Sequence, residues 1–252
     1  CMKDIIRFPR TASKVDKKAI DNVIAGINKH YRKSKQQMEL TTLRGSVFSE
    51  VKEYVPSGIL PLDCIVAYGK GFPIGIIEIY GAEHSGKTAI MEHTFAAAQR
   101  LGYYTLLFPM EYSVDYKRAE SVGIDVDSLI VFEDAECIED IYELIVETVT
   151  EIRKKDKDTP IVIGWDTVAA TPTRSELDNK RGLEASDMGK MAIQMSKLFR
   201  RLVKFLFQNK VCLLCLNQTR TNLGQQYGDK ETTYGGKALR FYSWIRLRIK
   251  TI

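Results

Sequence analysis

The sequence predicts an α/β protein with a mostly parallel central sheet that helices cover on both faces. Two observations predict this class. Short apolar runs alternate with segments of helical periodicity along residues 74–252, as in chains of repeated strand–helix units. A glycine-rich pattern at residues 81–88 joins the first of these strands to the first helix. Because ligands bind at the carboxyl ends of strands in such sheets, the residues after each strand are the first candidates for function.

Each element is predicted from its own pattern. The strands are runs of aliphatic and aromatic residues, whereas the helices carry apolar residues three and four positions apart, as Ile138, Ile141 and Ile145 do. The expected strands span residues 74–80, 103–108, 128–132, 160–165, 211–216 and 243–252. The expected helices span residues 87–101, 114–122, 138–154 and 188–209.

A further amphipathic helix is expected near the N-terminus, at residues 16–34. Apolar residues such as Ile20 and Ile27 recur there at helical spacing, and the opposite face is basic. This helix can pack equally well on its own core or on a neighbouring subunit. Residues 35–57 are polar and irregular, which is typical of a linker. The predicted organisation is an N-terminal basic segment with helix and linker at residues 1–57, and a core at residues 58–252.

The composition fits a globular protein with a substantial core, because 44% of its 252 residues are hydrophobic and 27% are charged. Neither a membrane-span run nor a signal-peptide pattern occurs in the sequence, so we expect no membrane association.

Cys212 and Cys215 lie three apart in a predicted strand, where they would face opposite sides of the sheet. We therefore expect buried free thiols rather than a zinc site, and a cytoplasmic location.

The charge distribution indicates a possible class of partner. The net charge is +5, and lysine and arginine are concentrated toward both ends of the chain, around a more acidic middle. Basic ends of this kind are compatible with a polyanion such as nucleic acid.

Residues 81–88 have the G-x-x-x-x-G-K-T pattern of a P-loop. Gly81 and Gly86 allow the backbone to turn its N–H groups toward phosphate oxygens, and the following helix adds the positive end of its dipole. Lys87 can bridge the β- and γ-phosphates, and the Thr88 hydroxyl can bind Mg²⁺. The residues expected to bind the triphosphate are Gly81, Ala82, Glu83, His84, Ser85, Gly86, Lys87, Thr88 and Ala89.

Three more polar residues follow strands on the same predicted edge. Asp166 ends an apolar strand and is expected to orient Mg²⁺ opposite Thr88. Glu111 is a candidate general base for an attacking water, although an exposed loop carboxylate is the alternative on spacing alone. The Gln218 amide can donate to a γ-phosphate and accept from another group, so it can report whether the triphosphate is intact.

Several segments together resemble the core of the RecA-type recombinases. They are residues 79–88, 96–100, 110–115, 166–172, 187–189, 217–220 and 228–242, and they keep the family's order and nearly its spacing from about residue 17 onward. The resemblance implies a RecA-like P-loop NTPase core that binds ATP and Mg²⁺. It also implies single-stranded DNA and a homologous duplex as partners, with self-association into a helical filament used in recombination and repair.

The resemblance also implies residue roles. Glu111, Lys87 and Gln218 would be the catalytic residues, with Gln218 also linking the γ-phosphate to DNA. Asp115 and Arg118 would contact adenine, although Arg118 stands where bacterial members stack a tyrosine. The helix at residues 16–34 would pack on the neighbouring protomer.

Two loops, at about residues 173–189 and 219–236, would meet single-stranded DNA. The residues expected to contact DNA are Arg200, Arg220, Gly235 and Gly236. Tyr227 and Tyr234 could contact bases, and Ile193 replaces a basic residue of the family.

Two other functions stay open. One is a non-catalytic RecA-like regulator or mediator that binds nucleotide and a recombinase. The other is a hexameric helicase or clock-type ATPase on the same core, although such proteins lack the pattern at residues 228–242. Ile252 precedes the family's next segment and its C-terminal domain, so we expect a divergent or phage-encoded member that is C-terminally truncated.

Overall fold

The computed structural model describes residues 16–33, 41, 53–111, 115–178, 189–221 and 231–250. The chain divides into two units, Cys1–Val51 and Lys52–Ile252. In the first unit, helix α1 spans Lys17–Lys33, close to the predicted range. Most of the predicted linker lies outside the described residues. None of the described helices combines the length and the apolar character that a membrane crossing requires.

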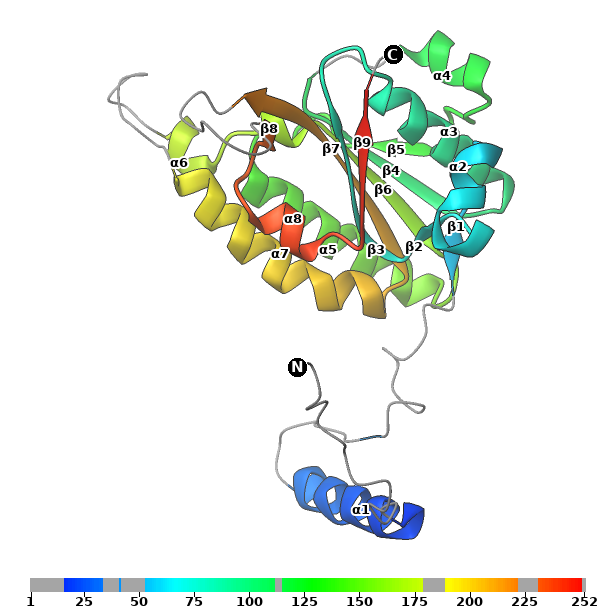
Figure 1. Ribbon diagram of the computed structural model, residues 1–252, viewed down its shortest axis with the longest axis vertical. Helices are drawn as coiled ribbons and strands as arrows, with labels where there is room; N and C mark the ends of the chain where they lie inside the picture. Colours follow the sequence, from blue (N-terminus) through cyan, green and yellow to red (C-terminus); the bar gives the residue numbers. More distant parts are fainter. Residues whose placement is uncertain are drawn as a thin grey trace, which may run out of the picture. The chain divides into compact units, whose positions relative to one another are not determined.

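The described part of the second unit contains a seven-stranded sheet with the order β5–β4–β6–β7–β3–β9, and β8 pairs with β7 (Figure 1). All neighbours along this order are parallel, whereas β8 is antiparallel to β7. The predicted α/β class with a mostly parallel sheet is therefore confirmed. The strands are β3 (Gly75–Gly81), β4 (Tyr104–Pro109), β5 (Leu129–Val131), β6 (Ile161–Asp166), β7 (Val211–Thr221), β8 (Glu231–Thr233) and β9 (Ile245–Ile249).

Helices cover both faces of this sheet (Figure 1). Helices α5 (Ile138–Lys155), α7 (Lys190–Gln208) and α8 (Ala238–Tyr242) pack on one face, and α3 (Lys87–Arg100) and α4 (Tyr116–Val122) pack on the other. Shorter elements precede or connect them. They are the antiparallel pair β1 (Tyr54–Val55) and β2 (Phe72–Pro73), helices α2 (Leu60–Ile65) and α6 (Arg174–Leu177), and the 3₁₀ turns Ala67–Gly69 and Val168–Ala170.

Alternate residues of the central strands β4, β6 and β7 enter two separate apolar cores. On β7, Leu213 and Cys215 belong to the core under α5 and α7, whereas Cys212 and Leu214 belong to the core under α3. The two cysteines therefore face opposite sides of the sheet, as the strand spacing predicts. Both are buried free thiols, and burial raises the pKa of each well above its ordinary value.

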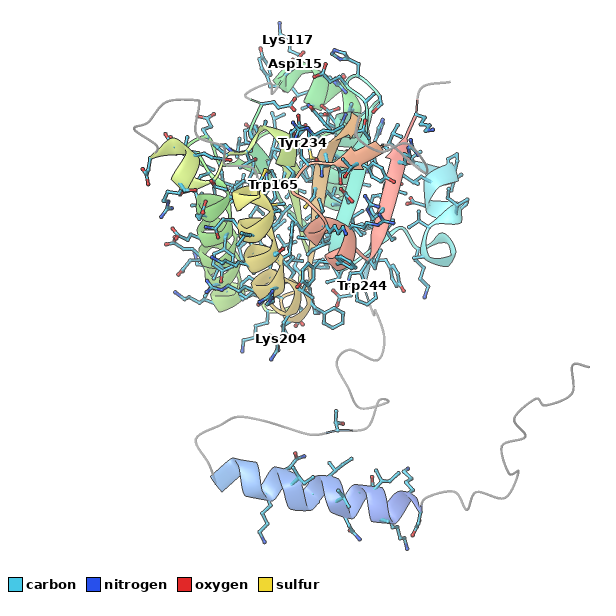
Figure 2. The ribbon with its side chains drawn as sticks, turned by 60° about the vertical axis from the view of Figure 1, so that its left-hand side comes forward. Asp115, Lys117, Trp165, Lys204, Tyr234 and Trp244 are labelled. Carbon is cyan, nitrogen blue, oxygen red and sulfur yellow. The ribbon has the colours of Figure 1, made fainter. Side chains whose placement is uncertain are left out.

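Trp165 is the largest fully buried side chain and lies in the core under α7, where its Nε1 donates to Thr171 Oγ1 at 2.8 Å (Figure 2). Figure 2 also separates the two ends of the sheet, because Asp115 lies near one end and Trp244 near the other. Asp115 marks the end at which the parallel strands terminate. Trp244 lies just before β9, and its backbone N–H donates to Ile76 O near the start of β3.

Strand β7 is longer than predicted. The prediction ended it at Leu216, but it continues to Thr221 and pairs there with β8, with Thr219 opposite Thr233. After Leu216 the residues of the strand are polar, so an apolar run in the sequence does not reveal this extension. β-Branched threonines on both strands favour this pairing. Asn217 and Gln218 thus lie inside a strand rather than after its end.

Gly164 allows α3 to approach the sheet closely. A Cβ atom at Gly164 would lie 2.4 Å from Met91 Sδ and 2.7 Å from Phe95 Cζ, and such distances are too short for real contacts. Because Met91 and Phe95 lie on α3, this close packing fixes the helix over β6. It thereby sets the first turn of α3 against Asp166, the last residue of β6.

We expect Gly164→Ala to lower the free energy of unfolding by about 1–3 kcal/mol, because it overpacks this contact. Urea unfolding measures the loss. In a Met91→Ala background, where the nearest clashing atom is absent, the same substitution should be less costly. An equal loss in both backgrounds would contradict the proposed packing constraint.

Candidate nucleotide and DNA sites

The loop between β3 and α3 is shaped by two glycines with different constraints. At Gly81 a Cβ atom would lie 2.4 Å from the carbonyl oxygen of Ile249 on β9 and 2.9 Å from Ser85 Oγ. Gly86 has φ +96°, a left-handed conformation that favours glycine, and immediately precedes α3. The loop therefore turns tightly and leads directly into the N-terminus of the helix.

Lys87 and Ser85 show what this loop can bind. The buried Lys87 Nζ donates to Ala82 O at 2.6 Å and to Gly81 O at 3.4 Å. The Ser85 hydroxyl is buried and has no hydrogen-bond partner among the described residues. Unsatisfied buried polar atoms are uncommon in proteins and call for a ligand or a water. A buried ammonium and a free hydroxyl in a loop before a helix N-terminus fit phosphate oxygens.

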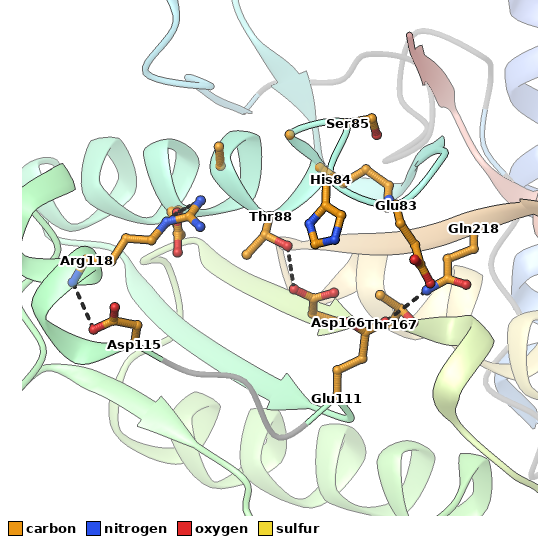
Figure 3. A pocket seen from close by; sticks show the side chains of 14 residues that line it. Glu83, His84, Ser85, Thr88, Glu111, Asp115, Arg118, Asp166, Thr167 and Gln218 are labelled. Carbon is orange, nitrogen blue, oxygen red and sulfur yellow. Dashed lines mark hydrogen bonds and ion pairs between the residues drawn. The ribbon is translucent and has the colours of Figure 1, made fainter. Parts of the chain in front are cut away.

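Thr88, in the first turn of α3, lies beside Asp166, the last residue of β6 (Figure 3). Thr88 Oγ1 donates to Asp166 Oδ2 at 2.9 Å. A hydroxyl and a carboxylate are hard oxygen donors that suit Mg²⁺, which usually binds through few protein groups together with phosphate oxygens and waters. With only these two oxygen donors, the pair fits a metal that the phosphates of a nucleotide also bind.

The electrostatic setting of Asp166 is unusual for an aspartate. Burial raises its pKa to about 6, and the negative charge of Glu111 raises it as well, against the lowering effects of the Thr88 hydrogen bond and the Lys87 charge. In the absence of a cation, the carboxylate is therefore a destabilised anion. A divalent cation would relieve this cost.

Glu111 lines the cavity beside Asp166 and receives two hydrogen bonds on one oxygen. Its Oε1 accepts from Thr167 Oγ1 at 2.9 Å and from Gln218 Nε2 at 3.2 Å. Its backbone N–H donates to Asp166 O at 3.3 Å. These bonds connect three strands, because Glu111 follows β4, Thr167 follows β6 and Gln218 lies within β7 (Figure 3).

Asp115 and Arg118 lie at the far end of the same cavity, near the start of α4. Asp115 caps this helix, because its side chain accepts from the backbone N–H groups of Lys117 and Arg118 at 3.0 and 3.3 Å. The half-exposed Arg118 guanidinium donates through Nε to Glu92 Oε2 at 3.1 Å, and its Nη2 lies 3.0 Å from the same oxygen in an ion pair. Glu92 thus fixes the plane of a cation that could stack on a base.

These groups line one cavity of about 580 Å³, a size typical of small-molecule sites. Gly81 and Ala82 are not part of its lining, but their carbonyl oxygens accept from Lys87. The predicted residues in the lining are Glu83, His84, Ser85, Gly86, Lys87, Thr88, Ala89, Glu111, Asp115, Arg118, Asp166 and Gln218.

Sequence reasoning missed Glu92 and Thr167, which also line this cavity. Glu92 lies four residues after Thr88 on α3, so helical spacing could have placed it on the same face. Thr167 contacts Glu111 only because the chain turns after β6, and no pattern in the sequence marks it.

A second cavity, of about 700 Å³, lies between the bases of the two predicted DNA loops, with Glu176 and Gly189 from the first loop and Arg220 and Gly235 from the second in its lining. Arg200 is exposed on α7 and is not part of this lining. Residues 179–188 of the first loop and 222–230 of the second, which include Tyr227, lie outside the described residues.

Gly235 and Gly236 have positive φ angles of +82° and +72°, which favour glycine. A Cβ atom at Gly236 would lie 2.8 Å from Ala192 Cβ on α7, so the end of the second loop packs closely on the helix that follows the first. The Arg220 guanidinium lies 4.2 Å from the centre of the Tyr234 ring. The second predicted loop therefore contacts the helix that follows the first loop, and Arg220 and Tyr234 hold its two described ends together.

A glycine-rich loop of the phosphate-binding kind follows one parallel strand, and an aspartate ends a nearby strand. These two features define the class of this protein as a P-loop α/β protein. The RecA N-terminal domain model matches residues 18–252. The chain belongs to the RecA family.

Curated relatives agree with this assignment. The protein RecA of Saccharopolyspora erythraea is 35% identical over 236 residues, which are 93% of this chain and 64% of the relative. The protein RecA of Ruminococcus albus is 33% identical over 249 residues, which are 98% of this chain and 59% of the relative. The chain thus spans about three fifths of the length of these relatives.

The raised pKa of Asp166 predicts a pH-dependent stability in the metal-free protein. Below the ordinary pKa of 3.8 the carboxyl is protonated in the folded and unfolded states, whereas above about 6 the folded protein bears the full cost of ionisation, about 3 kcal/mol for a shift of this size. Asp166→Asn should therefore become progressively more stable than wild type as the pH rises from about 4 to 7. Urea unfolding in EDTA measures this difference.

Asp156→Asn is the matched control. Hydrogen bonds from Thr159 and Asp158 lower the pKa of Asp156 to about 2, so its contribution is lost only as the pH falls through that value. Its difference from wild type should stay constant between about pH 4 and 7. A constant difference for Asp166→Asn over the same interval would contradict the assignment.

Proposed function

We propose that this chain is the core of an ATP-dependent DNA recombinase that forms a helical filament on single-stranded DNA and catalyses homologous pairing and strand exchange. The observation that carries the proposal is the position of Gln218. Its side chain donates to Glu111 at the nucleotide cavity, and its own strand β7 continues into the β7–β8 pair at the base of the second loop. One strand thus connects both sites.

In the proposed nucleotide site, the backbone of residues 81–88 and Lys87 bind the phosphates of ATP. Lys87 exchanges its contacts with Ala82 O and Gly81 O for phosphate oxygens. Thr88 and Asp166 would hold Mg²⁺, which supplies neutralisation of phosphate charge when bound. Arg118, which Glu92 orients, stacks on adenine, and Asp115 contacts its polar edge.

Glu111 is the proposed general base in this site. Its carboxylate accepts the proton of a water that attacks the γ-phosphate, while Thr167 keeps the side chain oriented through its hydrogen bond. Gln218 shares the same carboxylate oxygen. If the Gln218 amide also contacts the γ-phosphate, its hydrogen bond to Glu111 depends on whether ATP is intact. Gln218 is therefore the proposed sensor.

In the proposed DNA site, loops 173–189 and 219–236 contact single-stranded DNA from the strand-terminal edge of the sheet. Arg220 and the glycines at 235 and 236 line the cavity between their bases. Arginine can contact phosphates, and glycines allow close approach of backbone N–H groups. Arg200 on α7 is a further proposed contact. Helix α1 is proposed to pack on a neighbouring protomer and so to extend the filament.

The proposal is tested by electron microscopy of the protein with an ATP analogue, with and without single-stranded DNA. We expect helical filaments that Lys87→Ala abolishes, because the variant loses the charge that binds the phosphates. Lys155→Ala, at an exposed position at the end of α5, should leave the filaments intact. DNA binding that is indifferent to both ATP and Lys87 would refute the coupling, and rings would favour a helicase-type ATPase.

Glu111→Gln separates binding from turnover. It keeps the size of the side chain and removes its basicity, so DNA-stimulated ATP hydrolysis should fall by about 100-fold or more. Nucleotide and DNA affinities should stay near wild type. Glu120→Gln, at an exposed position on α4, is the control. Retained turnover in Glu111→Gln would remove Glu111 from the role of base.

A further inference from the structure

Glu78 is a charged residue in a place that usually excludes charge. It lies in the middle of β3, between Ile77 and Ile79 in the chain, and is fully buried. Burying a carboxylate is strongly unfavourable unless a cation and hydrogen bonds compensate it. The proposed chemistry of the nucleotide site does not use Glu78, because this residue does not line that cavity. Its contacts therefore indicate what it does.

Both oxygens of Glu78 have partners on the two strands beside β3. Arg246, directly opposite it on β9, donates through Nε to Oε2. The Arg246 guanidinium also lies 4.5 Å from the centre of the Tyr80 ring, which restricts its orientation. On the other side, Asn217 Nδ2 on β7 donates to Oε1 at 3.1 Å. Glu78 thus links β9 to β7 through the strand that leads into the P-loop.

Asn217 extends this link in two directions. It is fully buried, and its Nδ2 also donates to the backbone carbonyl of Tyr234 at 3.1 Å. Its Oδ1 accepts from the backbone N–H of Gln218 at 2.9 Å. Two amide hydrogens and the amide oxygen are therefore all engaged, which fixes the orientation of the side chain.

The two ends of this network lie at the two proposed sites. Gln218 contacts Glu111 at the nucleotide cavity, and Tyr234 immediately precedes Gly235, in the lining of the proposed DNA cavity. We propose that Glu78, Asn217 and Arg246 form a buried polar relay that positions residues 231–236 relative to Gln218. A movement of Gln218 is thereby transmitted to the end of the second DNA loop.

This inference rests on the proposed function, since it assigns the residues through which the two sites are coupled. None of the three is a catalytic residue, because each acts through Gln218 or Tyr234. A purely structural ion pair would contribute to global stability alone. A positioning relay would instead change the coupling between two ligands, which is the ratio of nucleotide affinities with and without DNA.

The test is Asn217→Ala, which removes all three hydrogen bonds. The affinity of a non-hydrolysable ATP analogue is measured by titration with and without oligothymidylate. We expect the DNA-induced increase in affinity to fall at least about fivefold, while the affinity without DNA stays within about threefold of wild type. Glu78→Gln, which keeps an oxygen for Asn217 Nδ2, should retain more coupling than Asn217→Ala. Wild-type coupling in Asn217→Ala would overturn the relay.

Glu53→Gln provides the matched control, because Glu53 pairs with Lys210 at 2.7 Å but contacts neither Gln218 nor Tyr234. Glu53→Gln should leave the coupling unchanged. If it lost as much coupling as Asn217→Ala, the effect would come from general weakening of the fold, and the relay would be overturned. Wild-type protein that binds neither ligand would instead refute the proposed function itself.

Hydrogen exchange measures positioning without any ligand. In Asn217→Ala, the amides of residues 231–236 should exchange at least about tenfold faster than in wild type, whereas those of β4 and β6 should not change. Uniform acceleration across the sheet, or unchanged exchange at residues 231–236, would overturn the relay. If Asn217→Ala does not fold, Asn217→Ser, which retains one hydroxyl, undergoes both measurements with the same criteria.

Discussion

The hydrogen bond from Gln218 to Glu111 joins β7 to the end of β4 across the mouth of the nucleotide cavity. The features of both proposed sites meet at this bond. On one side lie Thr167 and the Thr88–Asp166 pair. On the other side β7 continues to Thr221 and pairs with β8. A ligand that shifts the hydrogen bond of the Gln218 amide therefore acts directly on the strand that also supports the second loop.

The order of the strands is what brings these groups together. β6 lies between β4 and β7, and β7 lies between β6 and β3, so the residues at the ends of four parallel strands converge although they are far apart in sequence. Crossover connections pass over opposite faces on the two sides of such a point, which leaves a crevice at the strand ends. Close packing at Gly164 then fixes α3, and hence Thr88, against Asp166.

The parallel sheet and the convergence of Glu111, Asp166 and Gln218 could be predicted, because apolar runs mark buried strands and parallel strands end on one edge. The β8 strand and the extension of β7 could not, because polar residues outside the core carry no periodic pattern. The partners of buried polar groups could not be predicted from the sequence either. An acid such as Glu78 within an apolar run indicates a buried contact, but only the fold shows that Asn217, 139 residues away, provides it.

The most direct measurement of the central claim is the affinity of Gln218→Ala for oligothymidylate, with and without a saturating ATP analogue and Mg²⁺. We expect the variant to bind nucleotide and to retain the DNA affinity of the nucleotide-free wild type, but to lose the increase that the analogue produces. An undiminished increase in Gln218→Ala would show that the two sites communicate by another route, and would contradict the role assigned to β7.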